Sequence, residues 1–492
     1  MSKLVSDEIP QANRIEHAGV DVIAESARHG HPRSLFWPWC AANVAVLAVS
    51  WGGYVTGFGI NLTQALVVTV FGVIASFVLV GLASLAGQKG SAPTLVLSRA
   101  SFGIRGNWLP GLVSWLLLVG WETSLCALAA LSARTVSERL VDGSGDVAAA
   151  LALVLVAGSG IYYGVLGFEA IMRAQRWLTI ATLVLTVGFI ALTLDEVHLE
   201  TAFDQPAGSS TAVIGALVML LAGFGVGWIN CAADYSRYLP RDASRAGIVG
   251  WTTFGGALPV VLLAGYGALL CASDPDLIGA FSADPIGALT PMLPTWYLLP
   301  FIAVALLGLA AGVIIDIYSS GLTLVATGIP IQRPVAAALD GVMMKLGAIY
   351  VVWFAPDFLV PFQGFLITVG VPLAAWGGIF IADLLLRRER YDEAKLFDES
   401  ERGYGVANPT AIVIMLVGTV IGWGLVTNGL ASWLTWQGYL LEPVGLGGKD
   451  GDWAYANIGV LVALTIGFVG YLLLCSGRVR AQESRELATT RR

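Results

Sequence analysis

The sequence predicts an all-α membrane protein with twelve transmembrane helices. Of its 492 residues, 56% are hydrophobic and only 12% are charged, whereas a soluble globular protein carries about 25% charged residues. The apolar residues gather in runs of roughly 20, the length that a helix needs to cross a bilayer. The basic residues fall in alternate connecting segments, as membrane insertion favours.

The twelve apolar runs cover residues 36–59, 63–86, 108–132, 147–167, 174–194, 211–230, 246–271, 296–327, 336–355, 360–386, 409–429 and 455–476. The ninth run is the weakest because it contains Asp340 and Lys345. We expect residues 1–35 to form an N-terminal segment and 36–388 a ten-helix core. Residues 409–476 then form two peripheral helices, and 477–492 a tail.

The loop charges orient the chain in the membrane. If both termini are cytoplasmic, 24 of the 27 lysines and arginines lie on the inner side, and only Arg134, Arg139 and Lys449 lie outside. This is the bias that the positive-inside rule describes. The sequence therefore predicts a multi-pass protein of the cell membrane with both termini in the cytoplasm.

Two of the predicted spans are interrupted. The first contains CAANVAV and SWGGYVTGFG, and the sixth contains AGFGVGW, with three glycines in seven residues (222–228). Each glycine disfavours helix by roughly 1 kcal/mol, and irregular backbone in a membrane is tolerated where protein encloses it. Spans one and six are five apart, as expected for inverted repeats with discontinuous first helices, here 36–194 and 211–388. The breaks predict a central site between the two halves.

Two carboxylates lie near the middle of predicted spans: Glu122 in the third and Asp316 in the eighth. An ionised carboxylate at the bilayer centre costs at least roughly 2.5–3.5 kcal/mol, so neither is expected to face lipid. Neither has a lysine or arginine at helical spacing in its own span, which favours ligand binding or proton carriage over a structural role. Trp121 adjoins Glu122 and offers a flat aromatic face, which suits a planar heterocycle.

The sequence contains no Walker loop, HExxH or GxSxG motif, and its four histidines lie outside the spans. We therefore expect no enzyme activity, no cofactor, no metal site and no nucleic-acid partner. A channel or a membrane scaffold is the alternative from another class, but a scaffold gains nothing from broken spans and buried carboxylates.

Several strings resemble the nucleobase–cation symporter-1 family, in its purine/cytosine permease branch. They are FWPWCAAN (36–43), GQKGSAPTLVLSRASFGIRGNWLPGLVSWLLLVGW (87–121), AADYSRYLPRD (232–242), DIYSSGLTL (316–324) and FLITVGVPLAAWGGIFIADLLLRR (365–388). They occur in the family's order and extend from the first span to the tenth.

The resemblance implies a LeuT-like fold, with ten core helices in two inverted repeats of five and two peripheral helices. It implies a substrate site between spans one, three, six, eight and ten, with Trp121 stacking on the base and the unwound part of span six beside it. The substrate-binding residues that we expect are Ala42, Asn43, Trp121, Glu122, Phe224, Gly225, Trp228 and Asp316.

The chain departs from the family at two places. Leu125 stands where the family commonly offers an amide to the base, and Ala311 and Gly312 stand where sodium-coupled members carry hydroxyls. Because sodium, as a hard cation, prefers oxygen ligands, we expect proton coupling through Asp316 and Glu122. The expected function is proton-coupled import of cytosine or a purine. The alternatives are sodium coupling and another nitrogen heterocycle, such as a hydantoin, allantoin or a vitamin-like compound.

Overall fold

The computed structural model describes residues 5–7, 11–355, 359–400 and 403–490. Within these ranges, ten helical segments are long and apolar enough to cross a membrane. They are α3 (Leu62–Gly90), α6 (Trp108–Leu140), α7 (Gly145–Leu166), α8 (Phe168–Leu192), the segment from α10 (Ser210–Leu221) to α11 (Ala232–Ser236), α12 (Arg245–Ser273), α14 (Leu298–Ala326), α15 (Arg333–Trp353), α16 (Leu359–Leu386) and α18 (Gly459–Thr490).

Two further apolar segments complete the predicted set. α1 (Phe36–Asn43) and α2 (Leu47–Thr56) together cover the first predicted run, but the segment that they form is bent by 69°. α17 (Pro409–Gly424) has 16 residues, fewer than the roughly 20 of a typical span. Each predicted apolar run therefore contains a helix. That the chain crosses the membrane twelve times remains a prediction. α18 also continues past the predicted boundary at 476 into the segment predicted as a tail.

The remaining elements are short and connect the long helices. They are the strands β1 (Val5–Ser6) and β2 (Val22–Ile23), which pair in parallel, and the helices α4 (Thr94–Leu97), α5 (Arg99–Phe102), α9 (Leu199–Phe203) and α13 (Asp276–Ala283). Single 3-10 turns occur at 25–27, 32–35, 194–196, 287–292, 295–297, 395–397, 432–434, 448–450 and 454–456.

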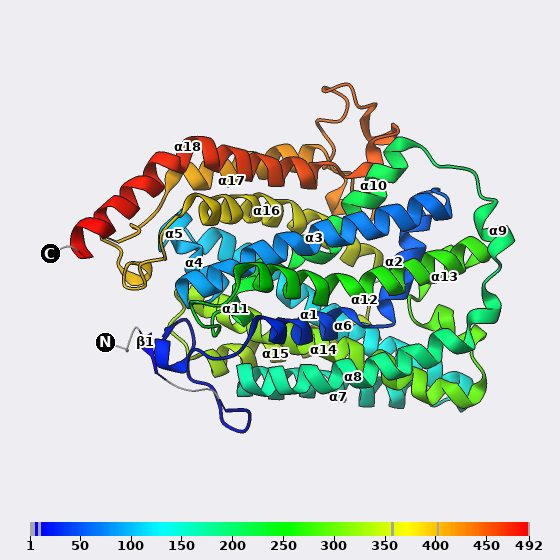
Figure 1. Cartoon of the computed structure of the whole chain (residues 1–492). Helices are drawn as coiled ribbons and strands as arrows, with labels where there is room; N and C mark the ends of the chain where they lie inside the picture. The colour runs from blue at the N-terminus through cyan, green and yellow to red at the C-terminus, as the bar shows by residue number, and fades with distance from the viewer. Residues whose placement is uncertain (1–4, 8–10, 356–358, 401–402, 491–492) are drawn as a thin grey trace.

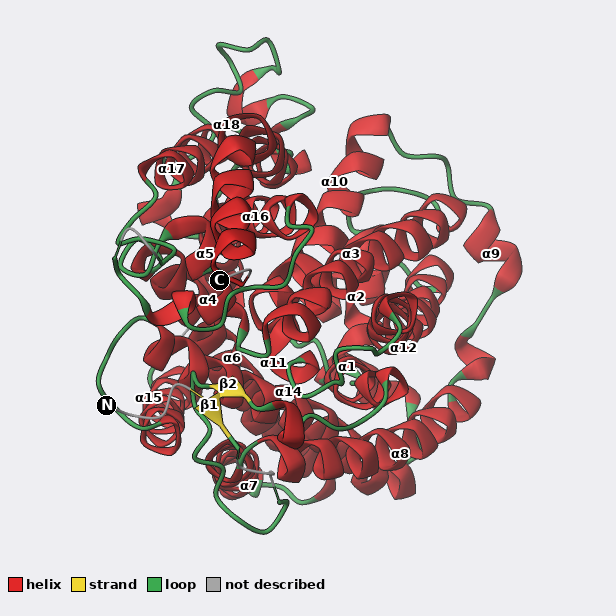
Figure 2. Cartoon of the chain, turned by 60° about the vertical axis from the view of Figure 1, so that its left-hand side comes forward, coloured by secondary structure: helices red, strands yellow, loops and turns green. Residues whose placement is uncertain are grey.

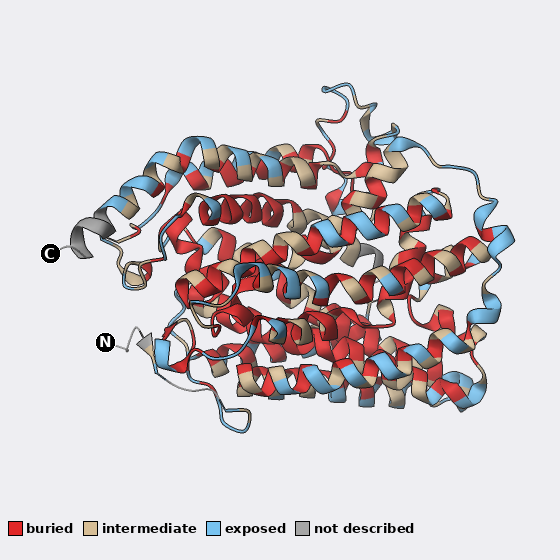
Figure 3. Ribbon diagram, viewed as in Figure 1, coloured by how far each residue is buried: buried red, intermediate tan, exposed pale blue. Residues whose placement is uncertain are grey.

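The long helices run roughly alongside one another, and both chain ends lie on the same side (Figure 1). We call this the terminal side; α9 and α13 lie toward the opposite side. Figure 2 turns the terminal side forward and shows the two strands there. α14 is buried along most of its length, whereas α7 and α8 expose large apolar side chains such as Leu155 and Trp177 (Figure 3). Exposed apolar faces of this kind suit contact with lipid tails.

The sixth predicted span changes its helical form at its glycine-rich centre. α10 passes into a π-helical turn, η4 (Ala222–Val226), and then into a 3-10 turn, η5 (Ile229–Cys231), before α11. These changes free backbone groups, and Ser76 of α3 satisfies two of them. Its hydroxyl donates to the Leu221 carbonyl at 2.9 Å and accepts from the Gly225 amide at 2.5 Å. The predicted irregularity is confirmed here. Among the described residues, only the first predicted span is bent by more than 40° at a break.

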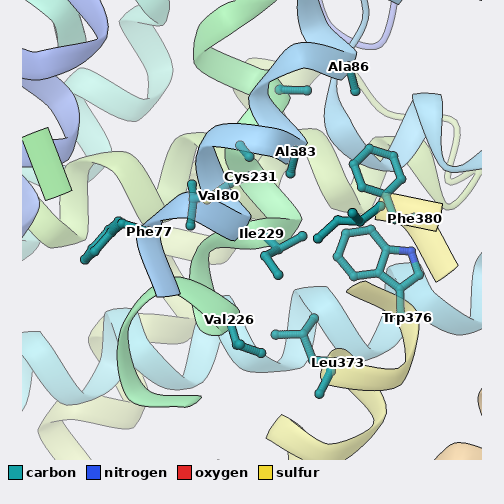
Figure 4. Close-up of a cluster of buried hydrophobic side chains, with 14 of the residues drawn as sticks. Phe77, Val80, Ala83, Ala86, Val226, Ile229, Cys231, Leu373, Trp376 and Phe380 are labelled. Carbon is teal, nitrogen blue, oxygen red and sulfur yellow. The ribbon is translucent and has the colours of Figure 1, made fainter. Parts of the chain in front are cut away.

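An apolar cluster holds this irregular segment between α3 and α16 (Figure 4). Val226 and Ile229 lie between Phe77 of α3 and Leu373 of α16, and all four are at most 2% exposed. Trp376 stacks on Phe380 one helical turn away, with ring centroids 5.3 Å apart. Close packing of large side chains on both sides fixes the path of the unwound backbone.

The N-terminal segment is built into the terminal side of the helix bundle. The carboxylate of Glu16, which is 2% exposed, accepts hydrogen bonds from the Phe168 amide at 2.7 Å, Arg237 at 3.1 Å, Tyr318 at 3.3 Å and the Tyr238 hydroxyl. We call these residues the Glu16 network. It joins the start of α8, the loop after α11 and the C-terminal third of α14.

Arginines extend these contacts. Arg333 at the start of α15 donates to the Glu16 carbonyl at 2.8 Å and to the Gly164 carbonyl at 2.6 Å. Arg28 donates to the Leu239 carbonyl at 2.6 Å and the Gln88 carbonyl at 2.9 Å. Burial lowers the pKa of Arg28 to about 10, so it remains charged at neutral pH. The N-terminal segment therefore fastens several helices together on this side.

Candidate functional site

The break in the first span lies directly against α14. Ala45, between α1 and α2, packs on Gly308, where an added Cβ would lie 2.8 Å from the Ala45 Cβ. Asn43, at the end of α1, is 5% exposed, and its side-chain amide donates to the Trp39 carbonyl at 2.8 Å. Ala42 is half-buried beside it. The break between α1 and α2 thus packs against α14, a helix that is buried along most of its length.

Glu122 of α6 and Asp316 of α14 approach each other in the interior. Glu122 is 0% exposed and Asp316 is 1% exposed. One helical turn before Asp316, Gly312 packs against Leu125 of α6, and the carbonyl of the neighbouring Ile315 accepts a hydrogen bond of 2.9 Å from Tyr235 of α11. Asp316 therefore lies in the part of α14 that contacts both α6 and the end of the sixth predicted span.

Neither carboxylate has a compensating partner in the part of the chain that the structure describes. Both oxygens of Glu122 and Oδ2 of Asp316 are buried and accept no hydrogen bond there. No lysine or arginine of the same ranges pairs with either residue. An uncompensated charge in such surroundings is costly, so these positions are suited to binding a proton or a ligand with hydrogen-bond donors.

Aromatic side chains surround the same region on several helices. Trp121 of α6 is half-buried and makes an edge contact with Phe362 of α16, with centroids 5.6 Å apart. Trp228, between η4 and η5, makes an edge contact with Trp39 of α1 at 5.8 Å. Trp121 thus connects α6 with α16, and Trp228 connects the sixth predicted span with α1. Both indoles are partly exposed.

Phe224 and Gly225, two of the predicted substrate-binding residues, lie in the π-helical turn and pack closely against neighbouring helices. Phe224 is 6% exposed and packs on Trp51 of α2, with centroids 4.6 Å apart. Gly225 lies against α3, because a Cβ there would be 2.1 Å from the Ser76 carbonyl oxygen. Its amide donates to Ser76, so in this conformation Gly225 maintains the helix distortion.

The positions that depart from the family pattern lie close together. Leu125 of α6 covers Gly312 of α14, where a Cβ would lie 2.8 Å from the leucine Cδ1. The neighbouring Ala311 carbonyl accepts a hydrogen bond of 2.8 Å from the Gln175 amide of α8. The sodium-coupled members of the family carry hydroxyl groups at these two positions. In this protein, a methyl group of Leu125 and the side-chain amide of Gln175 lie there instead.

Two further buried polar residues, which bond to α6, were not identified from the sequence. Asn230 in η5 is 0% exposed and donates to Ser114 of α6 at 2.8 Å, while its side-chain oxygen has no partner in the described residues. Asp340 of α15 is 0% exposed and accepts a hydrogen bond of 2.9 Å from Trp115 of α6. The position of Asn230 just after the glycine run could have identified it in the sequence. Asp340 entered the sequence analysis only as a charge that makes the ninth apolar run less hydrophobic.

The sequence matches the family described as permeases for cytosine/purines, uracil, thiamine and allantoin over residues 22–440. It is 22% identical to a putative purine-cytosine permease of Bacillus subtilis (strain 168), across 78% of this chain and 82% of the relative. It is 22% identical to purine-cytosine permease FCY2 of Saccharomyces cerevisiae, across 88% and 82%. It is 25% identical to the cytosine permease of Escherichia coli (strain K12), across 70% and 76%.

Solved structures share the fold. Mhp1, a nucleobase-cation-symport-1 family transporter in a closed conformation with bromovinylhydantoin bound, superposes with a TM-score of 0.66 at 18% identity, covering 97% of this chain and all of that one. A Na+-coupled sialic acid symporter superposes with a TM-score of 0.59 at 12% identity, covering 94% and 93%. The fold is therefore that of an all-α, LeuT-like membrane transporter. The chain belongs to the nucleobase–cation symporter-1 family, in the purine/cytosine permease branch, and is a transporter and not an enzyme.

Proposed function

We propose that this protein imports cytosine or a purine base by symport with protons. The observation that carries the proposal is the pair Glu122 and Asp316, which are buried on α6 and α14 without a cation in the described residues. We expect Trp121, which adjoins Glu122 in the sequence, and Trp228 to complete the site with aromatic faces. A nucleobase offers a flat ring for stacking and N–H groups for hydrogen bonds to carboxylates. The names of the curated relatives support this class of substrate.

Proton coupling is supported by the surroundings of Ala311 and Gly312. Neither residue has a side-chain oxygen, the Ala311 carbonyl is occupied by Gln175, and Leu125 covers Gly312. A sodium ion needs several oxygen ligands, whereas a buried carboxylate needs only one proton to become neutral. We therefore assign the coupling role to Asp316 and Glu122.

The substrate site that we propose is formed by the breaks in spans one and six together with α6, α14 and α16. Its residues are Ala42, Asn43, Trp121, Glu122, Phe224, Gly225, Trp228 and Asp316. We place the terminal side in the cytoplasm of the cell because the basic loop residues predict that orientation.

Uptake into proteoliposomes tests the proposal. The purified protein is offered radiolabelled cytosine, adenine, hydantoin or allantoin under an imposed proton gradient or an imposed sodium gradient. We expect accumulation of cytosine or a purine under the proton gradient. Accumulation under the sodium gradient alone contradicts the coupling assignment, and accumulation of only the hydantoin or allantoin contradicts the substrate assignment.

The variant Trp121→Ala tests the stacking role directly. Loss of base–aromatic stacking costs about 1–3 kcal/mol, so we expect the Kd for the transported base to rise roughly 5- to 150-fold. The matched control is Trp177→Ala, which removes an indole that is 66% exposed on the face of α8. If both variants bind the base with the affinity of the wild type, Trp121 does not stack on the substrate and serves only in packing.

A further inference from the structure

A third buried carboxylate, Asp340, lies on α15, outside the set of helices that forms the proposed substrate site. It is 0% exposed, and its Oδ1 accepts a hydrogen bond of 2.9 Å from the indole Nε1 of Trp115 on α6. Its Oδ2 is buried and accepts no hydrogen bond within the described ranges. A carboxylate of this kind is costly in an apolar span and calls for a functional explanation.

Ser320 of α14 connects Asp340 with Glu122. It is 0% exposed and lies beside Gly321, where an added Cβ would be 3.0 Å from the backbone nitrogen of Ala337, three residues before Asp340. It also lies one helical turn after Asp316, which is at the depth of Glu122. In the present geometry the Ser320 hydroxyl donates to the Ile317 carbonyl at 3.2 Å, which leaves both oxygens of Glu122 without a donor. A serine hydroxyl can accept one proton while donating another, so rotation of this group would join the two carboxylates.

The charged and titratable groups that face this pair are few. Besides the pair itself, α6 contributes Cys126 and α14 contributes Asp316. On α15, Lys345 is exposed. The described residues place no cation against Glu122 or Asp340. Two like charges cannot both remain ionised in such surroundings, so the pair is expected to share a proton.

The hydrogen-bond donors favour one arrangement of that proton. Trp115 donates to Asp340 and stabilises its anionic form, while Glu122 receives no donor. Hydrogen bonding to the charged form of an acid favours that form. The proton of the pair therefore belongs on Glu122, and the negative charge on Asp340.

Asp340 lies nearer to the terminal side than Glu122 does. Gly347 of α15 packs against Thr123 of α6, where an added Cβ would lie 2.8 Å from the threonine methyl group. With a rise of 1.5 Å per residue, Asp340 lies about 10 Å from Gly347 toward the start of α15, which is on the terminal side. Glu122 and Asp316 lie at a similar depth, because Gly312 of α14 packs against Leu125 of α6.

We propose that Asp340 receives the coupling proton from Glu122 through Ser320 and passes it on toward the terminal side. In this step the Glu122 carboxyl gives its proton to the Ser320 oxygen, and the Ser320 hydroxyl gives its own proton to Asp340. Glu122 becomes the anion, Asp340 becomes neutral, and the total charge is unchanged. This inference rests on the proposed proton coupling and adds a residue on α15 to it.

The experiment compares proton-driven uptake with exchange in the same proteoliposomes. Radiolabelled cytosine or adenine, whichever the wild type transports, is taken up under a proton gradient, and base-for-base exchange is measured without a gradient. We expect Asp340→Asn to reduce proton-driven accumulation at least tenfold while the exchange rate stays within about twofold of the wild type. The matched control is Lys345→Gln, an exposed change on the same helix, and Asp340→Glu should restore part of the accumulation.

Two further variants keep the test decisive if Asp340→Asn does not fold. Ser320→Ala removes the relay hydroxyl and should slow proton-driven uptake but not exchange. Trp115→Phe removes the indole N–H, so Asp340 binds its proton more tightly and the pH profile of uptake should move to higher pH.

Two results would overturn the role of Asp340. One is an unaltered rate in Ser320→Ala together with an unaltered pH profile in Trp115→Phe, and the other is full accumulation by Asp340→Asn. A wild type that shows no proton-driven uptake refutes the proposed function itself, which is a different result.

Discussion

Replacing Glu16 should destabilise the protein strongly, although this residue lies in the N-terminal segment and far from the proposed site in the sequence. Its carboxylate pairs with Arg237 at 3.1 Å, and the two side chains are 2% and 0% exposed. Removing one partner of a buried ion pair leaves the other charge uncompensated and typically costs about 3–5 kcal/mol. We expect Glu16→Ala to lose stability in this range, because Phe168, Tyr238 and Tyr318 also lose their acceptor.

The buried cysteines supply the assay. Cys40, Cys126, Cys231, Cys271 and Cys475 are all free and buried, so a thiol-reactive fluorophore labels them only when the protein unfolds. Heating the detergent-purified protein with this dye gives a Tm, and Glu16→Ala should lower it by several degrees.

A carboxylate in the same segment serves as the control. Glu25 pairs with Arg241 at 2.6 Å, but its side chain is 63% exposed. Exposed ion pairs contribute about 0–1 kcal/mol, so Glu25→Gln should leave the Tm almost unchanged. Equal Tm values for Glu16→Ala and Glu25→Gln would refute the reasoning. In the double variant Glu16→Gln/Arg237→Gln, the combined loss should be smaller than the sum of the single losses, because no buried charge is left unpaired.

Three further predictions concern the site and the pH. Asp316→Asn should abolish accumulation against a gradient but retain base exchange in proteoliposomes, and unchanged accumulation would remove Asp316 from the coupling mechanism. Gly225→Ala should lower the Tm in the thiol assay, because the added methyl group would meet the Ser76 carbonyl oxygen at 2.1 Å; a normal Tm would show that the π-helical turn tolerates a Cβ. The hydrogen bond of His29 to Glu169, 2.7 Å long, raises the pKa of His29. The stability that this pair adds is therefore full below the pKa of unfolded histidine, about 6.5, and is lost as the pH rises through the raised value. The Tm difference between the wild type and His29→Gln should accordingly shrink from pH 5.5 to pH 8.5, and a constant difference would contradict this.

The helix positions were predictable because they depend on local composition. A bilayer requires about 20 apolar residues for each crossing, so each run shows its position without knowledge of its neighbours. The same local reasoning identified Glu122 and Asp316, since a carboxylate inside an apolar run stands out wherever the run packs. It also located the irregular backbone at 222–228, because three closely spaced glycines weaken a helix whatever surrounds it.

Contacts between distant segments were decided only by the tertiary structure. The glycine pattern does not show that Gly225 faces Ser76, 149 residues away. No local signal pairs Trp115 with Asp340, which are 225 residues apart, or joins Glu16 to Tyr318, which are 302 residues apart. The sequence alone determined which segments are helical and apolar and which of them carry costly charges, because hydropathy is a property of each segment. Which charges meet, and what neutralises them, was decided by helix packing, because that depends on the rotation and depth of helices from opposite ends of the chain.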